Sequence, residues 1–415
     1  MASDAGYLAA SKRAPVSTGF MALLAAMSAL APMSLQIFVP ALPAIQAHFA
    51  VSPGVAQLAL SLSILASAVA ALSYGPLSDR FGRRPVLLAG LAMFIAGSIL
   101  CALAPTIDVL IVGRIIQSGG GAAGMVIARA IVRDLYARER AASMIAYLTM
   151  AMVVAPMLAP SVGALLLDLF EWHAIFVAVT AVGLLLIWRA QQRLFETRAG
   201  GSGGAGWSAL LSGTAALMRS AAFIAYVLQS TFAISVFFAF VAAAPYYMID
   251  ILHRPATEYG LWFIVVSLGF MAGNFVTARL GRRIGLDRMV LLGSCLVLVG
   301  VVLAAGLTVG GLWTPLALFG PMMLATFGNG LSVPNAQAGA VSVDPLLAGT
   351  ASGLSGFTQM LVAALVSQAV GMVQNGTPYP MLGFMVGCAA ISLLGFVLPR
   401  RLAGLALAGR PGSHG

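Results

Sequence analysis

Twelve long apolar runs, separated by short polar breaks, dominate this sequence of 415 residues. Hydrophobic residues make up 60% of the chain and charged residues only 8%, whereas soluble domains average about 45–50% apolar and 25% charged residues. Each run has the roughly 20 residues that a helix needs to cross a bilayer. Lipid cannot satisfy an open sheet, and strand-like alternation is absent, so we predict an all-α polytopic membrane protein.

The polar breaks divide the chain into spans, a linker and two tails. The spans are placed at 18–40, 54–77, 85–104, 107–130, 141–167, 173–189, 221–248, 258–279, 289–309, 312–338, 348–373 and 378–399. The long polar connection 190–220 contains the Gly/Ser-rich stretch Gly200–Gly206, which is typical of a linker. We therefore predict a cytoplasmic N-terminus (1–17), an N-terminal six-helix half (18–189), the cytoplasmic linker, a C-terminal six-helix half (221–399) and a cytoplasmic tail (400–415).

Positive charge is distributed unevenly between the two predicted faces. The net charge is +10, and all of the 22 Lys and Arg residues except Arg114 and Arg254 fall on segments that share one side with the N-terminus. Cytoplasmic loops of membrane proteins are rich in Lys and Arg, so both termini are expected in the cytoplasm. The charge thus indicates membrane topology and argues against nucleic-acid binding. The first apolar run continues into a full span, and no cleaved signal peptide is expected.

A short internal echo supports the two halves. The sequence Arg84-Pro-Val-Leu-Leu after the second run recurs as Arg288-Met-Val-Leu-Leu after the eighth. Duplicated halves are typical of transporter folds. In this alignment the position of Asp79 corresponds to Arg283, so the second copy lacks the acid.

The break after the second run reads GPLSDRFGRRPVLL and is the most distinctive polar segment. Its glycines permit a tight turn, and Asp79 can pair with arginines or lie at the N-terminus of a facing helix. We predict an inner gate in this region, although a solvated turn that only sets topology is the alternative. The predicted gate residues are Gly75, Asp79, Arg80, Gly82, Arg83, Arg84 and Arg133.

Arg114 is the one charge placed well inside a span. A central arginine is unfavourable by at least about 2.5–3.5 kcal/mol on insertion scales, which usually marks function. Gln117, Gly121 and Gly124 share its helix face, so the arginine is expected beside a polar partner and a strip for close packing. The alternative is a structural arginine bonded to backbone carbonyls of a neighbouring helix.

The fifth run contains two prolines four residues apart, followed by a glycine. Pro156 and Pro160 are expected to bend the helix, and small residues as far as Gly163 allow a partner helix to pack closely. The residues alone predict a kinked span against which another helix packs closely.

Amide side chains within the runs avoid the third, sixth, ninth and twelfth spans. We therefore expect those four spans to face lipid and the others to line a central path, with some amides acting as contacts between helices. The amides are Gln36, Gln57, Gln117, Gln229, Asn274, Asn329, Asn335, Gln337, Gln359 and Gln368. Six residues form the predicted substrate or proton path: Gln36, Arg114, Gln117, Gln229, Asn329 and Gln359.

Several of these segments resemble the major facilitator superfamily. GPLSDRFGRR (75–84) is similar to its GxLaDrxGrr loop, and RIIQSGG (114–120) resembles its RxxqG segment. APMLAPSVGA (155–164) is similar to the gxxxGPxxGG antiporter motif, with alanine at three glycine places. This resemblance implies a pivot between the halves at Pro156, Pro160 and Gly163, with an ordinary kinked span as the alternative. ALAPTIDVLIVGRIIQ, ARAIVRDLY and AGTASGLSGFTQ look like Bcr/CflA-type drug-resistance exporters. The resemblance implies two pseudo-symmetric six-helix halves, and an Asp79 that closes the cytoplasmic side by engaging arginines and the start of the eleventh span near Gly349 and Thr350.

One departure from these exporters falls in the first span. PMSLQIFVPALP (32–43) stands where they usually read PxxIDxYLPALP, so Gln36 replaces their membrane acid. None of the twelve acids is placed deep in the bilayer. Because glutamine can hydrogen-bond a substrate but cannot carry a proton, transfer of the family's proton-coupling residue to this chain is weakened. Arg114 makes a positive cavity that favours neutral or anionic amphiphiles.

The sequence predicts a membrane transporter, which we expect to be a monomer, and the resemblance implies an exporter of a bacterial cytoplasmic membrane. The resemblance implies antiport with protons and substrates such as amphenicol, bicyclomycin or sulphonamide-like drugs. A facilitator or metabolite exporter with little or no proton coupling is the first alternative, because of Gln36. A sensor or scaffold that does not transport is a second. An enzyme is not expected, because no nucleophile and base occur together at depth; neither a cofactor nor a metal site is predicted.

Overall fold

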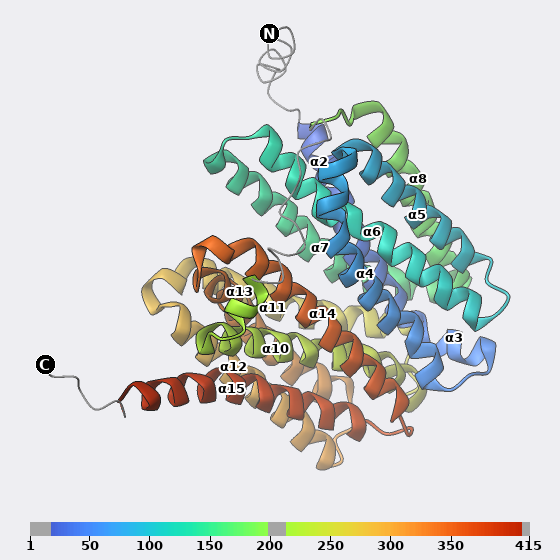
Figure 1. Ribbon diagram of the computed structural model, residues 1–415. Helices are drawn as coiled ribbons and strands as arrows, with labels where there is room; N and C mark the ends of the chain where they lie inside the picture. Colours follow the sequence, from blue (N-terminus) through green and yellow to red (C-terminus); the bar gives the residue numbers. More distant parts are fainter. Residues whose placement is uncertain (1–17, 198–212, 409–415) are drawn as a thin grey trace, which may run out of the picture. The chain divides into compact units, whose positions relative to one another are not determined.

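A computed structural model describes residues 18–197 and 213–408, and these residues are helical over most of their length (Figure 1). Within them, 12 helices are long and apolar enough to cross a membrane, which confirms the predicted fold class. The helices are α2 (Thr18–Phe38), α3 (Leu42–Phe49), α4 (Pro53–Phe81), α5 (Arg83–Ala102), α6 (Ile107–Leu135), α7 (Arg138–Phe170), α8 (His173–Arg193), α10 (Ala221–Tyr246), α11 (Ala256–Ile284), α12 (Leu286–Val309), α13 (Pro315–Ser342), α14 (Ala348–Met372) and α15 (Tyr379–Ala408), with short 3₁₀ turns η1 (Val39–Ala41) and η3 (Pro345–Leu347) and a π-helical turn η2 (Tyr247–Ile251).

Several helices extend past the predicted span ends on the arginine-rich side. α4 continues to Phe81, α6 to Leu135 and α11 to Ile284, each four or five residues beyond the apolar run. Basic residues occupy these last turns, where a positive charge interacts favourably with the helix dipole. The predicted turn from Gly75 to Arg84 is therefore wrong in its secondary structure: most of it is the end of α4, and only Gly82 separates α4 from α5.

The first span is longer than predicted and changes its helical type near its end. α2, η1 and α3 together form the span Thr18–Phe49, whereas the sequence prediction ended at 40. Pro40 and Pro43 lie at the beginnings of η1 and α3. Proline cannot donate a backbone hydrogen bond but fits the first helical positions, so the helix re-forms there and continues.

The described residues group into two compact units. One comprises residues 18–37, 66–159 and 173–197, and the other comprises residues 38–65, 160–172 and 213–408. The first, second and fifth spans therefore each contribute to both units. These units do not test the predicted division into two sequence halves at a linker. The Gly/Ser-rich stretch of that linker lies outside the described residues.

Glycines bring neighbouring helices into backbone contact within each unit. In α5 and α6, a Cβ added at Gly97 would lie 2.3 Å from the Gln117 nitrogen, and one added at Gly120 would lie 2.5 Å from the Gly90 oxygen. In α6, a Cβ at Gly124 would lie 2.1 Å from the Met27 oxygen of α2. Since lipid offers no hydrophobic drive between helices, such small-residue contacts hold a membrane bundle together. The predicted close-packing strip beside Arg114 is confirmed at Gly124.

The internal echo has a structural counterpart in two matching turns. Gly82 (φ 94°, ψ 155°) precedes α5, and Gly285 (φ 89°, ψ 149°) precedes α12. Both conformations lie in the positive-φ region that favours glycine. Superposing the two glycines pairs Asp79 with Arg282, one residue from the Arg283 inferred from the sequence, and the acid is absent from the second copy in either register.

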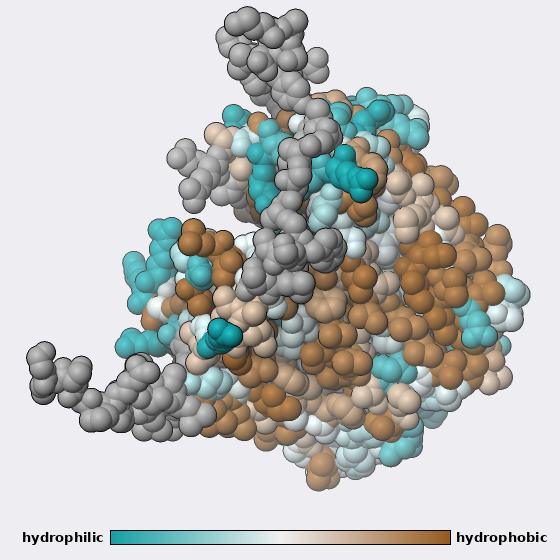
Figure 2. Space-filling model, in the orientation of Figure 1, coloured by the Kyte–Doolittle hydropathy of each residue, from teal (hydrophilic) through white to brown (hydrophobic). Residues whose placement is uncertain are grey.

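Apolar side chains cover much of the surface that Figure 2 displays. Exposed examples on different spans include Val177 (59%), Leu261 (63%) and Leu365 (61%). A soluble monomer rarely exposes apolar patches of this extent, whereas acyl chains solvate them.

Spans one, four, seven and ten have the most buried apolar windows, at 67–72%. The third, sixth, ninth and twelfth are 33–50% buried and the remaining four 22–50%, so burial does not single out the four that we predicted to face lipid.

Replacing Gly124 with alanine tests whether backbone contact holds α6 against α2. The added methyl group must displace the Met27 carbonyl, and overpacking of this kind lowers the free energy of unfolding by about 1–3 kcal/mol. We expect a lower midpoint of thermal unfolding in detergent. Gly306→Ala is the matched control, because no atom of the described residues lies within 4 Å of its added Cβ. Equal midpoints for the two variants would contradict the packing account.

Candidate functional site

Arg83 lies at the centre of a charged cluster where α4, α5 and α6 end or begin. Its Nη2 lies 2.8 Å from Asp79 Oδ1, and its Nε lies 3.0 Å from Asp134 Oδ2 of α6. Its Nη1 donates to the Ser78 hydroxyl at 2.6 Å, and the side chain is only 6% exposed. The planar guanidinium can contact all three groups at once because its donors point in fixed, different directions.

Glu196 joins this cluster from the segment after α8. Its carboxylate oxygens accept the backbone N–H groups of Arg83 at 2.8 Å and of Arg84 at 3.1 Å. These are free N–H groups at the start of α5, where a negative charge also interacts favourably with the helix dipole. A Cβ at Gly82 would lie 2.6 Å from Glu196 Oε2, so glycine is required both for the positive φ and for this carboxylate. Residues 194–197, which the sequence assigned to the linker, are thereby attached to the cluster.

The other predicted gate residues take different positions. Gly75 lies within α4, and a Cβ there would meet no atom of the described residues within 4 Å. Arg80 is exposed, with its guanidinium 5.1 Å from the centre of the Phe81 ring. Arg84 donates to the Gln191 carbonyl, and Arg133 is exposed in the last turn of α6 without an ion pair to any described residue. The structure thus brings Asp79, Gly82, Arg83 and Arg84 together.

Arg114 is 1% exposed and forms a buried polar chain. Its Nη1 donates to Gln117 Oε1 at 2.5 Å and to the Ser34 carbonyl of α2 at 3.3 Å. Gln117 Nε2 then donates to the Ser98 hydroxyl of α5 at 2.7 Å. The predicted polar partner is confirmed. The hydrogen bond to the Ser34 carbonyl is the contact expected of a structural arginine, which was the alternative interpretation. Arg114 therefore connects α6 to α2.

Gln36 lies two residues beyond the carbonyl that Arg114 contacts. It is 7% exposed, and its Oε1 has no hydrogen-bond partner among the described residues. A buried amide oxygen without a partner is unfavourable by about 1–3 kcal/mol. Such an atom is a candidate acceptor for a donor group on a substrate, and it carries no charge at any pH.

The amides of the C-terminal spans form interhelical contacts. Gln359 of α14 accepts from Gln337 of α13 at 3.1 Å and donates to the Ser230 hydroxyl of α10 at 3.0 Å. Gln229 donates to Ser294 of α12 at 3.0 Å, and Asn329 donates to the Ala233 carbonyl at 3.1 Å. The side-chain amide oxygens of Gln229 and Asn329 are buried without a partner among the described residues. Gln359 thus connects three helices, whereas the Gln229 amide nitrogen bonds to a predicted lipid-facing span.

A second polar group of contacts, which we call the outer seam, lies at the opposite ends of the spans. Gln57 of α4 donates to Ser367 of α14 at 2.6 Å, and Ser61 donates to Gln368 Oε1 at 2.7 Å. Gln368 Nε2 completes the pair by donating to the Gly54 carbonyl at 2.9 Å. All of these residues belong to one compact unit. The contacts therefore join the second and eleventh spans at the end that the charge distribution places outside.

The fifth span takes part in the outer seam through α11. Ser161 donates to the Gly260 carbonyl at 2.8 Å, and Asp168 Oδ2 accepts the Thr257 N–H at 2.9 Å near the start of α11. A Cβ at Gly260 would lie 2.7 Å from Ser161 Cα, which confirms that a partner helix packs closely on the small residues of this span. Gly163 is buried beside them. The compact units divide between Ala159 and Pro160, so the two prolines lie in different units.

Ser78, Asp134 and Glu196 were missed by the sequence prediction of the gate, as was the outer seam. Asp134 and Glu196 are far from Asp79 in sequence, and a single chain carries no signal that joins them. Gln57 and Gln368 were recognised as amides within spans, but their partner Ser367 is a residue type common throughout the apolar runs.

Comparison with known proteins decides the family. Residues 24–367 match the sequence profile described as Major Facilitator Superfamily. The chain belongs to the major facilitator superfamily. It is 30% identical over 382 residues to an uncharacterized MFS-type transporter, YdgK of Bacillus subtilis, covering 90% of this chain and 93% of that protein. It is also 30% identical to multidrug resistance protein MdtL of Escherichia coli (90% and 94% covered) and 26% identical to a bicyclomycin resistance protein homolog of Haemophilus influenzae (91% and 95%).

Solved structures of this superfamily share the fold. A bacterial homolog of the human lysosomal transporter Spinster matches with a TM-score of 0.74 at 15% identity, covering 97% of this chain and all of that one. A D-xylose–proton symporter matches with a TM-score of 0.71 at 14% identity, covering 92% and 96%. The major facilitator fold is thereby confirmed. Together with the twelve apolar helices, the relatives make this a multi-pass protein of the bacterial inner membrane.

Arg83→Lys tests the charged cluster. A lysine keeps the charge but cannot contact Asp79, Asp134 and Ser78 together, and losing hydrogen bonds to buried charged groups lowers the free energy of unfolding by about 1.5–3 kcal/mol. We expect a lower midpoint of thermal unfolding. Arg80→Lys is the control, because Arg80 is exposed and no ion pair joins it to a described residue; its guanidinium lies over the Phe81 ring. If both variants unfold at the wild-type temperature, Arg83 does not organise the cluster.

Proposed function

We propose that this transporter exports small amphipathic molecules, of the amphenicol, bicyclomycin or sulphonamide type, from the cytoplasm by alternating access. The observation that carries the proposal is similarity along almost the whole chain to proteins named for multidrug and bicyclomycin resistance. The solved relatives support the fold alone. Both termini are proposed to be cytoplasmic and the chain to act as a monomer, with six-helix halves at 18–189 and 221–399 on either side of the linker.

The substrate path is proposed to include Gln36, Arg114 and Gln117 in one half. Gln36 Oε1 is a buried acceptor without a partner among the described residues. The positively charged Arg114 side chain donates a hydrogen bond to the carbonyl of Ser34, two residues before Gln36. Gln359, Gln229 and Asn329 are the proposed polar groups of the other half. A buried guanidinium attracts electron-rich groups, so neutral and anionic amphiphiles are the favoured substrates.

Alternating access requires gates at both ends of the path. At the inner end the proposed gate is the Arg83 cluster with Asp79, Arg80, Arg84 and Arg133, and the engagement of the eleventh span by Asp79 is still a prediction. At the outer end the outer seam is closed in this conformer. Pro156, Pro160 and Gly163 are proposed as the pivot, in accord with the division of the compact units between the two prolines.

Proton coupling is the least supported part of the proposal. The relatives' names imply export, but the first span carries Gln36 in place of the acid that would take up a proton. A facilitator or metabolite exporter with weak coupling is therefore the second candidate, and Gln36 is the specific observation that favours it. Each charge moved inward through the membrane potential supplies about 2.3 kcal/mol per 100 mV, so even one coupled proton would sustain modest accumulation.

Flux measured in proteoliposomes, with and without an imposed pH gradient, tests the function and its coupling. We expect saturable transport of a chloramphenicol-class or bicyclomycin-class compound by the wild type, accelerated several-fold by the gradient. The gradient dependence should increase further in Gln36→Glu, because a carboxyl group can titrate where the amide cannot. If the wild-type flux is the same with and without the pH gradient, proton coupling is contradicted and the facilitator alternative is favoured. Absence of flux for a broad panel of compounds would contradict transport itself.

The same assay examines the site residues. Asp79→Asn and Arg114→Ala are expected to lower flux at least about tenfold, because they remove a gate ion pair and a buried charge respectively. Asp344→Asn is the matched control at the inner side, since its carboxylate only caps a local turn through the Leu346 N–H. Wild-type flux in both test variants would remove Asp79 and Arg114 from the mechanism.

A further inference from the structure

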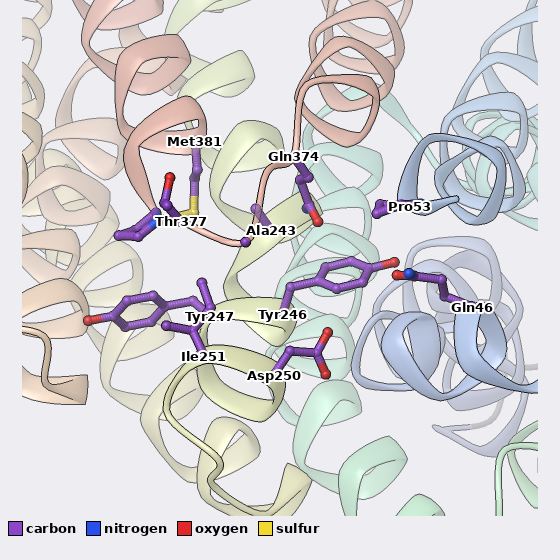
Figure 3. Close-up of a pocket in the computed structure, with 12 residues that line it drawn as sticks. Gln46, Pro53, Ala243, Tyr246, Tyr247, Asp250, Ile251, Gln374, Thr377 and Met381 are labelled. Carbon is purple, nitrogen blue, oxygen red and sulfur yellow. The ribbon is translucent and has the colours of Figure 1, made fainter. Parts of the chain in front are cut away.

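A cavity of about 210 Å³ lies at the outer end of the second compact unit (Figure 3). It is lined from three directions: by the end of α10 and the turn η2, by the segment between α14 and α15, and by residues of the first two spans. The residues that matter for its chemistry are Gln46, Tyr246, Asp250, Gln374 and Thr377. None of them belongs to the predicted path or gates.

The inner part of this cavity contains polar atoms without partners. Tyr246 is only 5% exposed, and its hydroxyl forms no hydrogen bond with any described residue. Gln46 Oε1 is likewise buried without a partner among the described residues. Figure 3 shows the Tyr246 hydroxyl directed toward Gln46. Buried hydroxyl and amide groups are normally satisfied, so the two atoms point to a ligand that can donate hydrogen bonds to both.

Asp250 provides the only charge among the residues that line the cavity. It is exposed, and it follows Tyr246 by four residues, so the π-helical turn presents both on the same side. The neighbouring Tyr247 hydroxyl is engaged elsewhere, since it donates to the Thr314 carbonyl at 3.4 Å. The nearby Arg254 lies 3.9 Å from Glu258, and neither residue lines the cavity.

We propose that this cavity binds a small primary amine in its ammonium form. An ammonium carries three N–H donors and a positive charge, which matches the Tyr246 oxygen, the Gln46 carbonyl and the Asp250 carboxylate. Ala243, Ile251 and Met381 provide apolar wall for a short alkyl chain. The carboxylate repels anions, and the volume is below the roughly 300–1,000 Å³ typical of sites for drug-sized ligands.

Binding in this cavity is expected to stabilise the closed outer seam, because of the spans from which the lining residues come. Gln46 and Pro53 come from the first two spans, whereas the other lining residues come from the end of the seventh span, the connection 373–378 and the start of the twelfth span. Pro53 adjoins Gly54, whose carbonyl belongs to the outer seam. An ammonium held by Gln46 and Asp250 together joins the first and seventh spans beside the outer seam, and it stabilises the conformer in which that seam is closed. This inference does not rest on which drug is exported or on proton coupling.

Calorimetric titration of the full-length protein in detergent with butylammonium chloride at pH 7 tests the site. We expect saturable binding, with empty micelles giving the background. 1-Butanol, which has the same chain without the charge, is expected to bind at least about tenfold more weakly, because charge-assisted hydrogen bonds are about twice as strong as neutral ones. Equal binding of the alcohol, or no saturable binding of the amine, would overturn the proposal.

Three variants locate the binding within the cavity. Asp250→Asn is expected to weaken butylammonium binding about tenfold and Tyr246→Phe a few-fold, because they remove the charge and one hydrogen bond respectively. Glu258→Gln removes a carboxylate at the same end of the same unit but outside the cavity, and is expected to bind like the wild type. Wild-type affinity in Asp250→Asn, with the variant folded by circular dichroism, would overturn the assignment, as would an equal loss in Glu258→Gln.

Discussion

The inability of lipid to solvate polar groups is the constraint on which the rest of this structure depends. Every amide, hydroxyl and charge within a span must find a partner in the protein or carry a free-energy penalty. Arg114 finds partners in Gln117 and the Ser34 carbonyl, and the outer seam pairs glutamines with serines. Some buried polar atoms have no partner among the described residues, and those on Gln46 and Tyr246 also line a cavity, which makes them candidate positions for a ligand.

Most of the fold could be predicted from the sequence, because apolar length alone requires spanning helices. All twelve spans were identified, and the errors lie at their ends. Helices such as α4 and α11 continue beyond the apolar run, since arginines in the last turn are compatible with both the helix dipole and the aqueous interface. The hydropathy of a sequence indicates which residues lie in lipid, so it does not show where a helix continues into water. Gly82 was correctly recognised as a turn residue, whereas Gly75 was not at a turn.

The candidate site was predictable only where one segment carries several of its residues. Asp79, Gly82, Arg83 and Arg84 are adjacent in sequence, and Arg114 has its partner Gln117 one helical turn away. Glu196, Asp134 and the Ser367 partner of Gln57 come from distant segments, and periodicity cannot bring them together. Asp250 was among the acids that the sequence did not place deep in the bilayer, but its relation to Tyr246 and Gln46 depends on a π-helical turn and on a segment of the first span.

The central claim is that the outer seam opens during transport, and cross-linking it is the most direct measurement. Gln57→Cys and Ser367→Cys place thiols where the side chains now hydrogen-bond at 2.6 Å, in a background with Cys101, Cys295 and Cys388 replaced. We predict that substrate flux in proteoliposomes stops when a short reducible reagent joins the two thiols, and returns on reduction. The Gln57→Cys single variant should be indifferent to the reagent. Undiminished flux through the cross-linked protein would contradict the account.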